Sequence, residues 1–366
     1  MNERLKPPFR ADHVGSLLRP QSLLDMRARA SEGEVSAEAL RAHEDECITQ
    51  VINMQQSLGL RGVSDGEFRR ESFHGDFIGR LNGVDFKLFD PGGNASGVAP
   101  FTAVVSEKIG WPEGGIEVEN FRFLKQHTTA TAKQTIPSPT MTHFRGGRAA
   151  IDELVYPQLD SFFADLAGVY REEIAGLASA GCDYIQMDDT NLAYLCDQAM
   201  RSSAEQRGED VDQLPHDYAR LINDSIRERP ADMSVCVHLC RGNARSRWFA
   251  QGGYEPVAEI IFNEIDVDGF FLEYDDERSG DFAPLRFVPQ GKVIVLGLLT
   301  TKHGELESKD AIKRRVDEAS RYVPMEQLCL SPQCGFASAV QGNLLSEDDQ
   351  QRKLAMVVEL GDEIWS

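Results

Sequence analysis

Four side chains that lie far apart in the sequence have the types that bind Zn²⁺, namely His238, Cys240, Glu273 and Cys334. One imidazole, two thiols and one carboxylate fall within the ligand set that tetrahedral zinc accepts. Each stands at or near the end of a short apolar run, so the complete fold would have to assemble the site. A zinc ion with two thiolate ligands is electron-rich, which suits it better to holding a thiol as a thiolate than to splitting water. The quartet therefore predicts alkyl transfer onto sulfur.

The spacing within the quartet supports a shared ion. His238 and Cys240 flank one residue of a β-prone run, and alternate residues of a strand point to the same side. Glu273 ends an apolar run, where a carboxylate is costly to bury without a partner. Cys334 precedes Gly335, and a glycine permits close approach of the backbone. We expect these positions to converge.

The bulk composition limits the partners of the chain. Its 366 residues include 59 acidic against 38 basic side chains, which gives a formal net charge of −21. Such a surface repels nucleic acid and anionic membranes, so neither is an expected partner. No run approaches the ~18–20 apolar residues of a membrane span, and the first residues do not resemble a secretory signal. The seven cysteines are scattered and odd in number, which favours a reducing cytoplasm over a disulfide framework.

Short β-type runs alternate with amphipathic stretches along the chain. Eight runs stand out: Ala11–Ser16, Gly62–Glu67, Gln134–Met141, Tyr184–Asp188, Ser234–Cys240, Gly269–Glu273, Lys292–Leu299 and Gln327–Cys334. Helical spacing of apolar residues marks Leu159–Ala180, Asp217–Glu228, Tyr254–Asn263, Lys309–Tyr322 and Glu347–Ile364. This alternation predicts an α/β fold, a (β/α)8 TIM barrel that occupies residues 1–366 as a single domain. An open doubly wound sheet is the alternative, but no glycine-rich phosphate loop opens any of the helices.

A barrel of this kind needs about 250 residues, so the remainder must be insertions. The largest lies between the second and third predicted strands, at about residues 82–131. Pro91–Gly97 reads as a turn within it, and β-prone segments such as Thr102–Val105 and Ile116–Phe123 follow. We expect a β-rich excursion that either covers the catalytic face or decorates the surface.

Taken together, the strand-end motifs resemble the C-terminal catalytic barrel of cobalamin-independent methionine synthase. The match follows chain order and includes His13-Val14-Gly15-Ser16, Ser64-Asp65-Gly66-Glu67, Ile185-Gln186-Met187-Asp188, His238-Leu239-Cys240, Glu273 and Pro332-Gln333-Cys334-Gly335. The segment Phe271–Gly280 is similar to the single-barrel relatives of that enzyme. The resemblance implies a zinc enzyme whose ligands correspond to His238, Cys240, Glu273 and Cys334.

The same resemblance implies the reaction. Zinc would bind the thiol of homocysteine and lower its pKa, and the thiolate would take the methyl group of 5-methyltetrahydrofolate to give methionine. Glu67 and Asp188 correspond to the carboxylates that bind the ammonium of the substrate, and the backbone at Gly15 and Ser16 to the segment that receives its carboxylate. Glu67 is also close in sequence to Arg69 and Arg70, with which it could instead form a surface ion pair.

Methyl transfer from a tertiary amine also requires that the departing nitrogen be protonated. The family uses a histidine after the seventh strand, and Lys302-His303-Gly304 occupies that region here. His303 is therefore the predicted proton donor, with Lys302 as the alternative.

Other functions remain open at this stage. The family's Asp-Glu-Pro-Ala turn reads Asp188-Asp189-Thr190-Asn191 here, and no aromatic residue for pterin stacking is evident after the third strand, so a simpler methyl donor is an alternative to methylfolate. A second candidate is another zinc-dependent thiol alkyltransferase, such as the relatives that open epoxides with coenzyme M. Glu67 and Asp188 favour an amino acid over the sulfonate of coenzyme M. A third candidate is a non-catalytic zinc-binding barrel.

Overall fold

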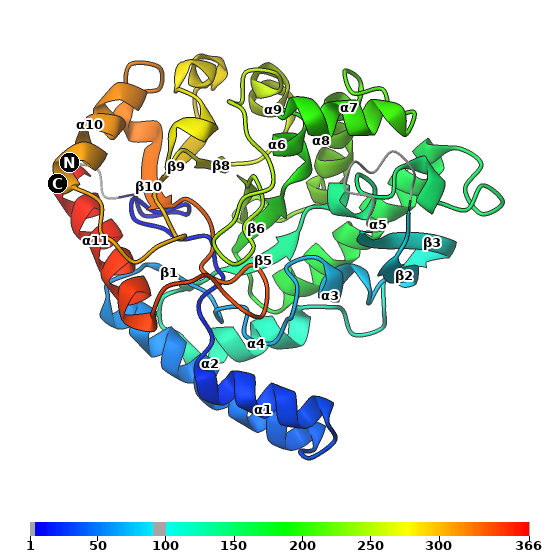
Figure 1. Cartoon of the computed structure of the whole chain (residues 1–366), viewed down its shortest axis with the longest axis horizontal. Coiled ribbons are helices and arrows are strands. Elements are labelled where there is room, and N and C mark those ends of the chain that lie inside the picture. Colours follow the sequence, from blue (N-terminus) through cyan, green and yellow to red (C-terminus); the bar gives the residue numbers. More distant parts are fainter. Residues whose placement is uncertain (1–3, 91–99, 366) are drawn as a thin grey trace.

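A parallel β-sheet forms the centre of the computed structural model, which describes residues 4–90 and 100–365. Its strands run in the order β10-β9-β8-β7-β6-β5, and helices lie around them (Figure 1). The strands are β5 (Gln134–Pro137), β6 (Tyr184–Asp189), β7 (Ser234–Leu239), β8 (Gly269–Glu273), β9 (Val293–Leu299) and β10 (Leu328–Pro332). Every residue of β7 and β9 is buried, as expected for strands that are covered on both faces.

The edges of this sheet are extended by short contacts. At one edge Ala11 forms a parallel bridge with Leu330 of β10. At the other, β4 (Thr131–Ala132) comes just before β5 in the chain and pairs in parallel with β1 (Gly62–Val63). The structure confirms the predicted α/β class and the parallel pairing of the last six strands. The two predicted N-terminal strands are much shorter than expected, and the pairs described do not form a continuous eight-stranded ring.

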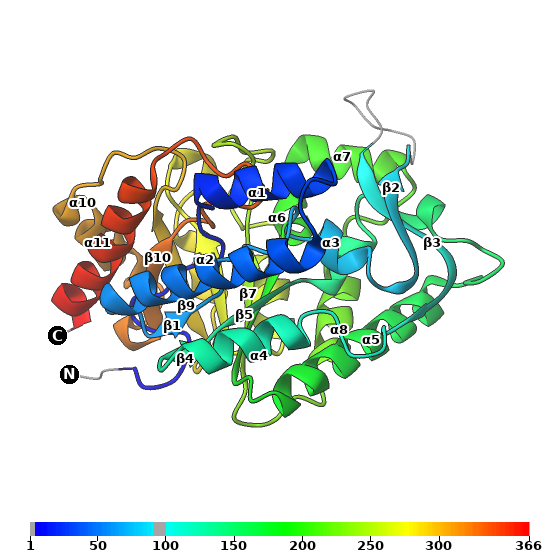
Figure 2. The ribbon, with the colours of Figure 1, turned by 90° about the horizontal axis from the view of Figure 1, so that it is seen from below.

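The five predicted amphipathic stretches all contain helices. They form α5 (Leu159–Ser179), α8 (Leu214–Ile226), α9 (Ala258–Glu264), α10 (Lys309–Ala319) and α11 (Glu347–Trp365). The other helices are α1 (Gln21–Ser31), α2 (Ala37–Ser57), α3 (Gly75–Ile78), α4 (Val118–His127), α6 (Asn191–Tyr194) and α7 (Gln198–Gln206), and the 3-10 turns are η1 (Pro139–Thr142), η2 (Arg148–Ala150), η3 (Glu277–Ser279), η4 (Ala283–Phe287) and η5 (Met325–Gln327). In Figure 2, α1 and α2 lie side by side along one side of the molecule.

Side-chain caps set where two of these helices begin. Ser36 Oγ accepts a hydrogen bond from the backbone N–H of Ala39 at the start of α2. Ser308 Oγ accepts one from Ala311 at the start of α10. Each cap satisfies a backbone donor that has no partner within the helix, so the sequence itself marks these boundaries. Among the described residues, no helix combines the length and apolarity needed to cross a membrane.

An antiparallel hairpin lies between β1 and β4 in the chain. Its strands are β2 (Asn82–Leu88) and β3 (Phe101–Gly110), and it lies at the opposite end of the molecule from α10 and α11 in both views (Figures 1 and 2). Residues 116–123, predicted to be β-prone, instead contain the first half of α4. The predicted turn Pro91–Gly97 falls outside the described residues.

Side chains on alternate positions of the parallel strands enclose a small apolar core. It consists of Val14, Tyr184, Cys236, Phe271, Val293, Val295 and Cys329. Cys236 and Cys329 are fully buried in this core, and all seven cysteines are free of disulfide bonds. Side chains two residues apart in a strand share a side. The residues that follow this core along β6, β7 and β8 therefore lie on the same side as the core, nearer the C-terminal ends of the strands.

Candidate metal centre

Strand β7 positions two of the predicted zinc ligands. Cys236, His238 and Cys240 alternate along the same side of the chain, and Cys236 belongs to the apolar core. His238 and Cys240 follow it toward the C-terminal end of the strand and are 2% and 5% exposed. Along this side of β7, one core residue is therefore followed by two potential metal ligands.

Strand β10 brings the third potential ligand to the same place. Cys334 is two residues beyond the end of β10, and strict alternation from Cys329 would aim it to the opposite side. A shift in strand register between Ser331 and Pro332 changes that alternation, and the Cys334 Sγ lies 3.2 Å from the Cys240 Sγ. The next residue must be small, because a Cβ on Gly335 would lie 1.8 Å from Ser16 Oγ.

His238, Cys240 and Cys334 form a buried trio whose potential ligand atoms all lie within 4.8 Å of one another. Hydrogen bonding from Cys240 lowers the pKa of Cys334 to about 5, with His238 adding to this effect against the opposing influence of burial. Burial opposes charge on His238, but its contacts with Asp188 and Cys334 outweigh this and raise the pKa of His238 to about 10. The two shifts describe a Cys334 thiolate that is stabilised by Cys240 and by a protonated His238.

Asp188 orients the imidazole of this trio. Its Oδ1 lies 3.0 Å from the Nδ1 of His238 and accepts a second hydrogen bond, 2.7 Å long, from Gln186 Nε2. The other ring nitrogen of His238, Nε2, is buried and has no hydrogen-bond partner among the described residues. An imidazole with Nδ1 on a carboxylate and Nε2 unused is the usual arrangement of a metal-binding histidine. The trio therefore offers one nitrogen and two sulfur donors, a set that fits Zn²⁺.

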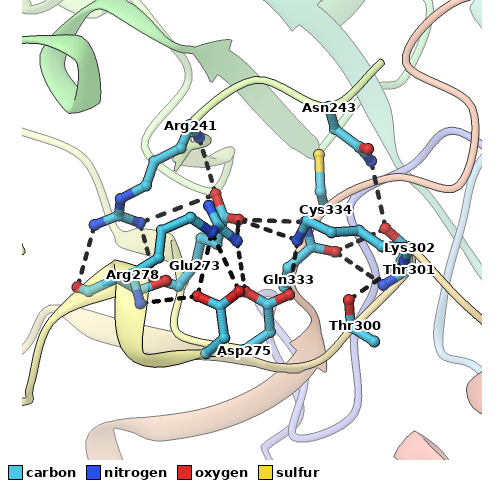
Figure 3. A network of polar contacts seen from close by, with 12 residues as sticks. Arg241, Asn243, Glu273, Asp275, Arg278, Thr300, Thr301, Lys302, Gln333 and Cys334 are labelled. Carbon is cyan, nitrogen blue, oxygen red and sulfur yellow. Dashed lines mark hydrogen bonds and ion pairs between the residues drawn. The ribbon is translucent and has the colours of Figure 1, made fainter. Parts of the chain in front are cut away.

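Glu273, the fourth predicted ligand, lies at the end of β8 but outside this trio. Its carboxylate is fully buried among cations (Figure 3). Oε1 accepts a 2.5 Å hydrogen bond from Arg278 and lies 3.4 Å from Lys302 Nζ, and Oε2 accepts from the backbone N–H of Arg241 at 2.9 Å. Burial would raise the pKa of Glu273, but the charges of Lys302, Arg241 and Arg278 more than offset it and lower that pKa to about 2.

Two adjoining cavities share part of their lining, and the smaller of them reaches the trio. The smaller has a volume of about 30 Å³ and is lined by Ser16, Asp188 and the three residues of the trio, among others. The larger has a volume of about 350 Å³, and Glu67 is among its lining residues. Arg70, Phe73 and Asp188 line both. A thiol group could therefore reach the trio while the rest of the same molecule occupies the larger cavity.

Glu67 is held in a strained and tightly packed position in the larger cavity. Its φ of 59° is in the left-handed region, which is costly for a residue with a Cβ and is often found at functional sites. Its Oε1 accepts a 2.7 Å hydrogen bond from Thr135 and its Oε2 pairs with Arg70. Gly15 must be a glycine here, because its φ is +124° and a Cβ would lie 2.7 Å from Glu67 Oε1. The ion pair with Arg70 thus exists, but it is buried rather than at the surface.

The two candidate proton donors lie in different surroundings. His303 is exposed and is not among the lining residues of the described cavities. Lys302 is nearly buried, with its Nζ 2.7 Å from Asp275 Oδ2 and 3.4 Å from Glu273 Oε1. His303 therefore does not line the cavity at the trio, whereas Lys302 is held by two buried carboxylates, those of Glu273 and Asp275.

Two arginines of the site, Arg241 and Arg278, did not emerge from the sequence as functional candidates, and both lie beside Glu273. Arg70, which the sequence suggested as a partner of Glu67, lines both cavities. The sequence offered one signal for each of the first two: Arg241 directly follows Cys240, and Arg278 ends the charged run Asp275–Arg278. Charged residues at strand ends are common on protein surfaces, so those signals alone do not identify buried partners.

Comparison with known proteins gives consistent matches over nearly the whole chain. Residues 9–355 match the family model described as the catalytic domain of cobalamin-independent synthase. An uncharacterized protein of Bacillus subtilis (strain 168), YxjH, is 43% identical over 368 residues, which cover 98% of this chain and 96% of YxjH. The methionine synthase of Pyrococcus abyssi is 24% identical over 324 residues, which cover 88% of this chain and 85% of the synthase.

Solved structures with the same fold include two bacterial proteins. One, from Listeria monocytogenes, is named provisionally as a vitamin-B12-independent methionine synthase. It has a TM-score of 0.80 and 40% identity, and the match covers 99% of this chain and 100% of that one. A B12-independent methionine synthase from Shewanella sp. W3-18-1, solved in complex with selenomethionine, has a TM-score of 0.73 and 19% identity, with 96% of each chain covered.

Proposed function

Because this chain belongs to the family of cobalamin-independent methionine synthase catalytic domains, we propose that it transfers a methyl group to the thiol of homocysteine and so forms methionine. The observation that carries the proposal is the buried trio of His238, Cys240 and Cys334, which offers nitrogen and sulfur donors at the edge of a cavity. Zinc bound there would lower the pKa of the substrate thiol and keep it as a thiolate at neutral pH. Glu273 is the further predicted ligand.

The residues around the trio suit an amino-acid thiol. In this proposal Glu67 and Asp188 receive the ammonium of homocysteine, and the backbone at Gly15 and Ser16 receives its carboxylate. Both hydrogen bonds of Asp188 fall on Oδ1, so Oδ2 is left for a further donor. Two carboxylates favour an ammonium over the sulfonate of coenzyme M, which weighs against an epoxide-opening enzyme.

The chain would also exclude water and hold the methyl donor. The cavity at the trio is about 30 Å³ in volume, little more than one water molecule needs, so a bound thiol would displace solvent. The donor, 5-methyltetrahydrofolate or a simpler methyl donor, would approach through the larger cavity. With the folate, the methyl carbon forms a bond to sulfur as the carbon–nitrogen bond breaks, and the departing nitrogen takes up a proton. Lys302 and His303 remain the two candidates for that proton.

We propose further that the parallel sheet belongs to a (β/α)8 barrel formed by residues 1–366 as one domain. The bridge between Ala11 and Leu330 and the pairing of β1 with β4 lie where the first two strands of such a barrel would close the ring. In that arrangement the trio stands at the C-terminal ends of the strands, where the active sites of barrel enzymes are found.

A turnover assay on the zinc-loaded full chain tests the proposed function. Homocysteine is supplied with 5-methyltetrahydrofolate or with small methyl donors, and methionine is measured. We expect methionine from at least one donor, and Cys334→Ser should abolish both its formation and stoichiometric zinc binding. Cys329→Ser is the matched control, because it removes a buried thiol from β10 outside the trio. A chain that binds zinc but forms no methionine with any donor, and whose zinc does not respond to homocysteine, would instead be a non-catalytic zinc protein.

A further inference from the structure

Two residues that line the smaller cavity carry a buried polar side-chain atom without a hydrogen-bond partner among the described residues. One is Nε2 of His238, which the proposed metal ion would use. The other is Oδ1 of Asn243, a residue that is 5% exposed. An amide oxygen that is buried without a donor costs free energy, so its position needs an explanation. The usual ligands of zinc are nitrogen, thiolate and carboxylate, so the ion does not provide one.

The amide of Asn243 is held in one orientation by its nitrogen. Nδ2 donates to the backbone carbonyl of Gly335 at 3.0 Å and lies 3.4 Å from Thr301 Oγ1. A backbone carbonyl can only accept, so Nδ2 must face Gly335, and Oδ1 lies on the other branch of the amide. The side chains of Asn243 and Cys334 lie next to each other (Figure 3), and both residues line the smaller cavity. The loop after β7 thus places a fixed acceptor at the cavity wall.

A second buried asparagine shows that joining these loops does not require an unpartnered oxygen. Asn343 is 6% exposed, and its Nδ2 donates to the carbonyl of Thr301 at 2.9 Å. Its Oδ1 accepts a 3.0 Å hydrogen bond from the backbone N–H of Ser246, in the loop after β7. Asn343 is not among the lining residues of the described cavities. The two asparagines share a structural role, but of the two only Asn243 keeps an acceptor for a ligand.

The chemistry of the cavity restricts what Oδ1 of Asn243 can receive. A thiolate held at the trio is itself an acceptor, so it does not bond with an amide oxygen. The ammonium of homocysteine is assigned to Glu67 and Asp188, and Asn243 does not line the larger cavity that contains Glu67. The electropositive group that remains is the methyl group that moves to sulfur. Its hydrogens carry partial positive charge in the transition state, where a C–H···O contact is favourable.

We propose that Oδ1 of Asn243 contacts the transferred methyl group and leaves no room beside the sulfur for a larger alkyl group. This inference rests on the proposed function and adds a specificity-determining residue to the site. The methyl carbon forms its bond to sulfur as its bond to the leaving atom breaks, and Asn243 neither gains nor loses a proton. The cavity volume of about 30 Å³ agrees with a transferred group as small as methyl.

Turnover separates this contact from a role in binding the thiol. Asn243→Leu removes the amide oxygen and keeps the approximate size of the side chain. With a donor that gives methionine, kcat should fall by roughly 2- to 5-fold, which corresponds to the loss of one C–H···O contact. The dissociation constant of homocysteine should stay within about twofold, because the contact forms only with the donor present. A loss of homocysteine affinity as large as the loss of kcat would overturn the assigned contact.

Two amino acids that differ by one methylene test the proposal without any methyl donor. Methionine and its S-ethyl homologue, ethionine, are titrated calorimetrically into the zinc-loaded full chain. An extra methylene in a closed pocket costs about 10- to 200-fold, so ethionine should bind the unaltered chain at least about tenfold more weakly. Asn243→Ala opens space beside the sulfur, and the ratio of the two dissociation constants should fall to about three or less. Asn243→Ser opens the same space if the alanine variant does not fold.

Asn343→Ala is the matched control, because it removes a buried asparagine from the same loops but not from the cavity wall. It should keep the ratio of the unaltered chain, even where both amino acids bind more weakly. An unchanged ratio in Asn243→Ala would overturn the proposal, as would equal binding of the two amino acids by the unaltered chain. If the unaltered zinc-loaded chain binds neither methionine nor homocysteine, the proposed function itself fails.

Discussion

At the scale of single residues, the sequence allowed two interpretations of Glu67. Its neighbours suggested a surface ion pair, whereas the family resemblance implied that it binds the ammonium of the substrate. The structure has the ion pair with Arg70, but in a buried position at the edge of the larger cavity. The apolar patterns of the sequence predict where a strand ends and which residues follow it. They do not predict whether the loop that carries those residues folds against the protein or toward solvent.

Replacing Glu67 by Gln should weaken homocysteine selectively. The amide keeps the size of the side chain but loses the charge that would hold the substrate ammonium. A hydrogen bond to a charged group contributes about 1.5–3 kcal/mol, so the dissociation constant of homocysteine should rise by roughly 10- to 100-fold. In calorimetric titrations, the dissociation constant of 4-mercaptobutyrate, which lacks the amino group, should differ little between the variant and the unaltered chain. Glu71→Gln, at an exposed acid of the same loop, is the control. Equal losses for both thiols would remove Glu67 from this role.

At the scale of elements, the strands predicted most accurately are those that are buried along their whole length. β6 to β10 are buried at every position, and β9, which is almost entirely Val, Ile and Leu, has the pattern of a parallel strand covered on both faces. In the first two predicted strands, pairing is limited to Ala11 and to Gly62–Val63, and the backbone then leaves the β region at Gly15, Gly66 and Glu67, whose φ angles are positive. A glycine in the sequence indicates that a positive φ is possible, whereas a glutamate does not indicate one.

The turn η1 and helix α8 are joined by a buried histidine that should make stability depend on pH. His143 follows η1, and its Nδ1 lies 2.9 Å from Tyr218 Oη on α8. Burial, with the nearby charge of Arg207, lowers the pKa of His143 from 6.5 to about 4. As the pH falls, this histidine is protonated in the unfolded chain before it is protonated in the folded one. Its contribution to the free energy of unfolding is therefore complete above about pH 6.5 and is lost as the pH falls toward 4.

Chemical denaturation between pH 7 and pH 4 measures this contribution. His143→Gln should lower the free energy of unfolding at pH 7. The decrease in that free energy between pH 7 and pH 4 should be smaller than in the unaltered chain, by up to about 3 kcal/mol. His216→Gln, at an exposed histidine of α8, is the matched control. If the curves of the unaltered chain and His143→Gln stay parallel throughout, the imidazole does not titrate differently in the two states.

At the scale of the whole molecule, the trio joins segments that the chain separates by nearly a hundred residues. His238 and Cys240 belong to the end of β7, and Cys334 follows β10, which is separated from β7 in the sheet by β8 and β9. The sequence could predict this convergence, because parallel strands present their C-terminal ends at one edge. It could not predict that Glu273 would be held by Arg278 and Lys302. Those partners depend on how two loops fold beside each other, and strand periodicity contains no information about that.

Zinc should therefore act as a cross-link that stabilises the complete fold. A ligand that binds only the folded chain adds about 4 kcal/mol when its free concentration is about 1,000 times its dissociation constant. Thermal unfolding should shift upward on addition of zinc and return on addition of a chelator. Cys334→Ala should lose this response, because the trio is incomplete without it. Cys329→Ala should unfold at a lower temperature yet keep the full zinc response, since its thiol packs in the apolar core of the sheet. A zinc response that survives in Cys334→Ala would place the ion elsewhere and remove the trio as the basis of the site.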